Sequence, residues 1–154
     1  MKNILLCCLF VFSFQMVSAQ ITMTEKTDWQ PIGKLKSLGS TIASLEYSVS
    51  GRDTIYLLLM KDFTKRGENA EAQYFSIKFN GVDDTLKNFH QLLKSFFLDE
   101  NRKDKKYTQT FRLGDQMVHL QHTLLVTGKG VMLSTKEGYI NLSKGNIEKL
   151  FHKE

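Results

Sequence analysis

Histidine and acidic side chains are the residues best suited to catalysis or metal binding, and their spacing argues against both. His119 and His122 are three residues apart, which on a helix would place them on one face as a ligand pair. The residues around them alternate as in a strand, so the two rings point to opposite faces. The chain's four histidines match no ligand spacing of a zinc or iron site. We therefore expect neither a metal nor a cofactor.

The adjacent carboxylates Asp83 and Asp84 have an ordinary structural explanation. Both precede an amphipathic segment, where they would cap free amide groups and favour the positive end of the helix dipole. The chain also lacks a Gly-x-Ser-x-Gly nucleophile elbow and a complete phosphate-binding loop. We assign no catalytic residue. One enzymatic alternative stays open, a hydrolytic site that assembles only in three dimensions from His122, Asp115 and a nearby Ser or Thr.

Basic residues gather in two segments of the chain. They are Lys61, Lys65, Arg66, Arg102, Lys103, Lys105 and Lys106. If the two segments meet at one end of a sheet, they form a rim that attracts lipid headgroups, acidic glycans or a protein partner. A solvated surface without a ligand is the alternative. Aromatic residues do not alternate with these charges, so we expect no nucleic-acid partner.

Two further features bear on partners and modification. Trp29 is the only tryptophan, and it either anchors the polar segment around it or contacts a partner. The sequences Asp53-Thr54-Ile55 and Asp84-Thr85-Leu86 resemble the three-residue O-glycosylation sequon of exported proteins in some Gram-negative bacteria. That resemblance implies glycan attachment at Thr54 and Thr85.

The first 19 residues have the layout of a secretory signal peptide. Lys2 precedes an apolar run, and Val17-Ser18-Ala19 supplies small residues at a cleavage position. The run is too short and too interrupted for a membrane span, so we expect no transmembrane segment after cleavage. Cys7 and Cys8 precede the cleavage position, which predicts a mature protein without cysteine or disulfide bonds. We expect a periplasmic or secreted protein.

The rest of the chain predicts one α+β domain over residues 41–154, preceded by a polar leader over residues 20–40. Alternating or apolar runs predict strands at residues 41–49, 54–60, 74–79, 107–113, 116–126, 131–133 and 139–142. The residues that follow Asp84 predict one long helix, and Ser143 begins a short second helix. Residues 99–105 carry charges of both signs and predict a solvated turn.

This order predicts a meander and a helix, repeated once. We expect about six to seven strands in a largely antiparallel sheet, with both helices packed on one face. The other face would carry Tyr56, Tyr74 and Met117 and remain open to a partner. The function that follows is a small exported domain without catalysis, which binds an unknown protein or envelope component. A structural subunit that self-associates through an edge strand is a further alternative.

Overall fold

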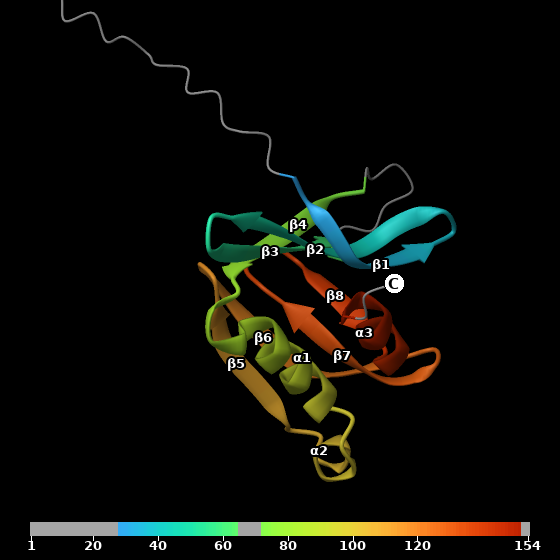
Figure 1. Cartoon of the computed structure of the whole chain (residues 1–154). Coiled ribbons are helices and arrows are strands. Elements are labelled where there is room, and N and C mark those ends of the chain that lie inside the picture. Colours follow the sequence, from blue (N-terminus) through green and yellow to red (C-terminus); the bar gives the residue numbers. More distant parts are fainter. Residues whose placement is uncertain (1–27, 65–71, 152–154) are drawn as a thin grey trace, which may run out of the picture.

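The computed structural model describes residues 28–64 and 72–151 of the chain (Figure 1). The predicted signal peptide, residues 1–19, lies outside this part, as do Lys65 and Arg66. Within the described part the chain forms eight strands, three α-helices and one short 3-10 helix. The α+β class and the antiparallel pairing of the strands confirm the prediction from sequence.

The N-terminal sheet is a four-stranded antiparallel meander, in which each strand pairs with the next in the chain. Its strands are β1 (Gln30–Ser37), β2 (Ser40–Ser50), β3 (Asp53–Lys61) and β4 (Tyr74–Asn80). Alternation along each strand places one set of side chains in the core. Leu45, Leu58 and Ile77, for example, are buried in one row across β2, β3 and β4.

The C-terminal sheet repeats this meander. Its strands are β5 (Thr108–Leu113), β6 (Gln116–Leu125), β7 (Gly128–Ser134) and β8 (Tyr139–Leu142). Leu120, Leu133 and Ile140 form its matching buried row. The buried apolar residues of both sheets belong to one hydrophobic cluster, so the two meanders share a single core.

The expectation of one sheet with both helices on one face is wrong. The chain forms two sheets, and the helix that follows each meander contacts the other sheet. Phe89 of helix α1 (Thr85–Ser95) lies 6.1 Å from Phe79 of β4 and 6.0 Å from Phe111 of β5, between ring centroids, so α1 contacts both sheets. Helix α3 (Lys144–Phe151) follows the C-terminal sheet and packs on β1 and β2. Figure 1 shows α1 with the lower sheet and α3 between the two sheets.

Asp62 joins the two sheets at the end of β3. Its carboxylate is buried and accepts hydrogen bonds from the amides of Thr64 at 2.9 Å and Tyr139 at 3.3 Å. The Phe63 amide in turn donates to the Tyr139 carbonyl at 3.1 Å. These bonds connect the end of β3 to β8. They also supply the donors that a buried carboxylate requires.

The helix starts confirm one capping prediction and overturn another. Ser143 caps α3, because its hydroxyl accepts the Asn146 amide at 3.1 Å. The 3-10 helix Val82–Asp84 leads into α1, and both of its aspartates have positive φ, 50° at Asp83 and 55° at Asp84. Neither carboxylate forms a cap bond to a helix amide. A capping residue usually has an extended backbone, whereas both aspartates have left-handed dihedral angles.

Two other expectations about chain organisation are corrected. Residues 30–37, assigned to a polar leader, form β1, whose Ile32 and Leu35 are buried. The charged turn at residues 99–105 contains a short helix, α2 (Asp99–Lys103), with acids in its first turn and bases in its last. That order suits the helix dipole, which explains why so short a segment is helical.

The open face expected to carry Tyr56, Tyr74 and Met117 does not exist as one surface. Tyr56 points to the core side, where its ring lies 5.3 Å from Phe79. Tyr74 is exposed on the N-terminal sheet, and Met117 is exposed on the C-terminal sheet. Met117 is separated from the two tyrosines because the strands divide into two sheets, and Tyr56 is separated from Tyr74 because they lie on opposite faces of one sheet.

Candidate functional site

The candidate site is a cavity of about 330 Å³ between α2 and the β6–β7 hairpin. Its lining combines cationic side chains with one histidine and one exposed leucine. The lining residues are Arg102, Lys105, His122, Thr123, Leu124 and Lys129. We call this cavity the cationic pocket. The lining contains no acidic side chain.

His122 fixes one wall of the pocket. It lies on the core side of β6, where its ring packs edge-on against Phe96 at 5.2 Å between centroids. Its Nε2 lies 2.9 Å from the carbonyl oxygen of Asn101. A carbonyl oxygen can only accept, so Nε2 carries a proton and donates. The bond orients the ring and attaches α2 to the strand.

Lys129 makes a second connection between the hairpin and α2. Its Nζ donates to the carbonyl oxygen of Arg102 at 2.5 Å. A further bond connects α2 to α1. The side-chain amide Nδ2 of Asn101 donates to the carbonyl oxygen of Ser95, at the end of α1, at 2.9 Å. Two carbonyls in the last turn of α2, those of Asn101 and Arg102, therefore accept side-chain donors.

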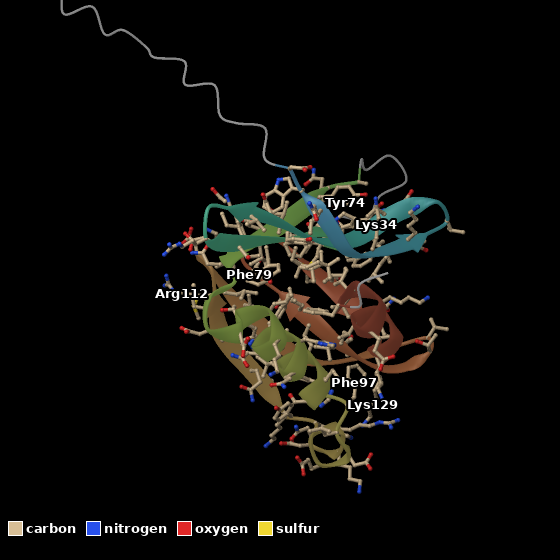
Figure 2. The ribbon with its side chains drawn as sticks, viewed as in Figure 1. Lys34, Tyr74, Phe79, Phe97, Arg112 and Lys129 are labelled. Atoms are coloured by element: carbon tan, nitrogen blue, oxygen red, sulfur yellow. The ribbon has the colours of Figure 1, made fainter. Side chains whose placement is uncertain are left out.

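The charges at the pocket are not neutralised by the protein. Arg102, Lys105 and Lys129 form no ion pair with a carboxylate in residues 28–64 and 72–151. Asp104 is the acid next to Lys105 in sequence, and its carboxylate accepts the Lys106 amide at 2.8 Å. Figure 2 shows Lys129 directed to the same end of the molecule as α2. Three unpaired cations around one cavity attract anions, since each can form charge-assisted hydrogen bonds.

Two other cavities are less suited to an anion. A wider groove of about 750 Å³ between β1 and α3 contains Lys34, Lys36 and Lys149, but Glu148 also lines it. A cavity of about 380 Å³ is lined by Tyr47, Tyr56 and other uncharged residues. The Tyr47 hydroxyl there donates to Gln30 at 2.6 Å. Only the cationic pocket, among these three, combines cations with an acid-free lining.

Among the described residues of the two basic segments, Lys61 does not lie at the same end of the molecule as Arg102 and Lys103. Lys61 ends β3 in the N-terminal sheet, whereas Arg102 and Lys103 belong to α2 at the far end of the C-terminal half (Figure 1). The rim prediction is therefore wrong for Lys61. Arg102 lines the cationic pocket, and Lys103 is exposed beside it in sequence.

The hydrolytic alternative is not supported by the positions of its residues. Asp115 lies in the β5–β6 turn and His122 near the other end of β6, roughly 20 Å away at strand spacing. His119 lies on the opposite face from His122, with its Nδ1 2.7 Å from the Thr110 hydroxyl. In residues 28–64 and 72–151, no three side chains of His, Cys, Asp or Glu gather as metal ligands.

The remaining predicted residues occupy separate places. Trp29 is half-buried just before β1, and Thr54 is half-buried in β3 beside Tyr56. Thr85 begins α1, where its hydroxyl donates to the Val82 carbonyl. No helix in the described ranges is long and apolar enough to cross a membrane.

Sequence reasoning missed three residues of the pocket. Lys129 was considered only as part of an incomplete phosphate loop, and Leu124 only as a strand residue. His122 was considered as a catalytic or core residue. The available signal was the pairing of the β6–β7 hairpin, which places Lys129 opposite Leu124. The chain matches no protein-family model, no curated protein and no solved structure.

Proposed function

We propose that this chain is an exported, non-catalytic binding domain and that it holds an anionic ligand in the cationic pocket. The observation that carries the proposal is the convergence of Arg102, Lys105 and Lys129 on one cavity without a carboxylate partner. The apparent signal peptide at residues 1–19 supports export to the periplasm or beyond.

Binding is favoured over catalysis by the way the pocket uses His122. Its Nε2 proton is donated to a main-chain carbonyl, and its ring is packed against Phe96. A catalytic histidine usually has a nucleophile on one ring nitrogen and a carboxylate on the other. His122 has no such pair in the described residues, so its contacts support a positioning role.

An anion titration monitored through backbone amide resonances tests the proposal. We use pyrophosphate as the probe, because its charge density suits several cations at once. We expect saturable shifts at Arg102, Lys105 and the residues from His122 to Lys129. The Lys105→Ala variant should weaken these shifts, because it removes a cation whose side chain makes no hydrogen bond or ion pair in residues 28–64 and 72–151.

The matched control is Lys36→Ala, which removes the same charge from the β1–α3 groove. It should leave the titration unchanged. Shifts centred on Lys34 and Lys149 would place the anion in that groove instead and contradict the proposal. An absence of any saturable shift would contradict it as well.

A further inference from the structure

The β6–β7 hairpin ends in apolar side chains that the fold leaves exposed. Leu124 is 84 % exposed and Val126 is 108 % exposed relative to an extended reference. Single exposed apolar residues are common on protein surfaces. Here, however, Leu124 also lines the cationic pocket, beside Arg102, Lys105 and Lys129, and Val126 follows two residues later.

The hairpin tip is held in place rather than loosely attached. Leu125, between the two exposed residues, is half-buried and folds over Gly130. A Cβ atom at Gly130 would come within 2.5 Å of the Leu125 Cδ1 and within 2.8 Å of the main-chain oxygen of Leu142, and the second contact requires glycine there. The bonds of His122 and Lys129 to α2 fix the same hairpin from the other side. Leu124 and Val126 are therefore presented by a supported element.

The combination of exposed apolar and cationic groups suits one kind of partner best. A bilayer with anionic lipids offers negatively charged headgroups directly above an apolar interior. A second copy of the chain is a poorer partner, because a two-fold contact would bring the same three cations together. Charge complementarity therefore favours an anionic membrane surface.

We propose that the cationic pocket and the tip of the β6–β7 hairpin form one membrane-docking surface. Leu124 and Val126 enter the headgroup region, and Arg102, Lys105 and Lys129 bind the lipid phosphates around them. This inference rests on the proposed anion binding and names the source of the anion.

Vesicle co-sedimentation of the purified protein tests the inference. We expect binding to vesicles of equimolar phosphatidylcholine and phosphatidylglycerol, and little binding to phosphatidylcholine alone. Leu124→Ser should weaken vesicle binding about tenfold, because the variant loses the apolar surface that leucine would transfer from water into the membrane. Lys105→Ala should weaken it about fivefold, which corresponds to one cation lost near an anionic surface. High salt should also weaken binding.

The matched controls lie at the other end of β6. Met117, 52 % exposed, pairs with Arg112 across β5 and β6 on the outer face of the sheet. Figure 2 shows Arg112 on the opposite side of the molecule from Lys129. Met117→Ser and Arg112→Ala remove an exposed apolar group and a cation, and both should bind vesicles as the unaltered protein does.

The outcomes separate this inference from the proposed function. Pyrophosphate binding without vesicle binding would overturn the docking surface and leave the anion site standing. Vesicle binding by Leu124→Ser as strong as that of the unaltered protein would overturn the insertion of the hairpin tip. An equal loss in Arg112→Ala would show attraction by overall charge, and an equal loss in Met117→Ser would show that any exposed apolar residue serves. Either result would contradict a localised surface. Failure of both probes with the unaltered protein would overturn both proposals.

Discussion

His122 donates from Nε2 to the carbonyl oxygen of Asn101 at 2.9 Å and thereby joins β6 to α2. His122 lines the cationic pocket from β6, and Asn101 precedes Arg102, which lines it from α2. α2 has only five residues, too few to be stable as a helix alone. Its position therefore depends on this bond and on the bond from Lys129 to the Arg102 carbonyl.

Replacement of His122 should loosen α2 before it unfolds the protein. In His122→Ala the Asn101 carbonyl keeps the Asp104 amide but loses its side-chain donor, and Phe96 loses a ring contact. We expect unfolding free energy to fall by about 1–3 kcal/mol, within the range for a lost bond to a partly buried group. Urea denaturation measures this loss, and amide hydrogen exchange should accelerate most in residues 99–103.

His119→Ala is the control for that substitution. His119 bonds Thr110 on the outer face of the sheet, away from α2. Its replacement should leave exchange in α2 unchanged. Equal acceleration of exchange in both variants would contradict the positioning role assigned to His122.

Gly33 should tolerate no side chain, because α3 lies directly on it. A Cβ atom at Gly33 would come within 2.4 Å of the carbonyl oxygens of both Lys149 and Leu150. These are main-chain atoms of a packed helix, so α3 must move in Gly33→Ala. We expect a loss of about 2–4 kcal/mol in unfolding free energy, as for overpacking in a core. Thermal or urea denaturation measures it.

Gly145→Ala, a substitution in α3 itself, should have the opposite effect on stability. A Cβ atom there meets nothing within 4 Å. Alanine in a helix is favoured over glycine, so the variant should be more stable by about 0.5–1 kcal/mol. A Gly33→Ala protein as stable as the unaltered one would contradict the packing of α3 on β1.

Export should be visible in the mass of the protein recovered from outside the cytoplasm. If cleavage follows Ala19, the intact mass corresponds to residues 20–154, and no cysteine remains for alkylation. Mass above that value by whole sugar units would indicate glycosylation, with Thr54 and Thr85 as the expected positions. Full-length protein found only in the cytoplasm would contradict the signal peptide.

The local parts of the fold could be predicted from sequence because their signals are local. Alternation at residues 41–49 marks β2, and Ser143 marks the start of α3. β1 was missed because Pro31 and Gly33 resemble loop residues. The pairing with β2 is also irregular at these two positions, which weakens the alternation there. The division into two sheets was missed because no residue pattern shows that β4 and β5, consecutive strands with α1 and α2 between them, do not pair.

The candidate site was predictable only in part for the same reason. Arg102 was recognised as a basic contact from its charge. Lys129 and Leu124 join it because the β6–β7 hairpin pairs them and packs beside α2. Such a contact between segments distant in sequence depends on tertiary packing, which no local pattern of residues reveals.

Calorimetric titration of the purified protein with pyrophosphate tests the central claim most directly. We predict one saturable site, a Kd raised about three- to fivefold by Lys105→Ala, and a Kd unchanged by Lys36→Ala. No saturable heat, or equal weakening by both substitutions, would contradict an anion site at the cationic pocket.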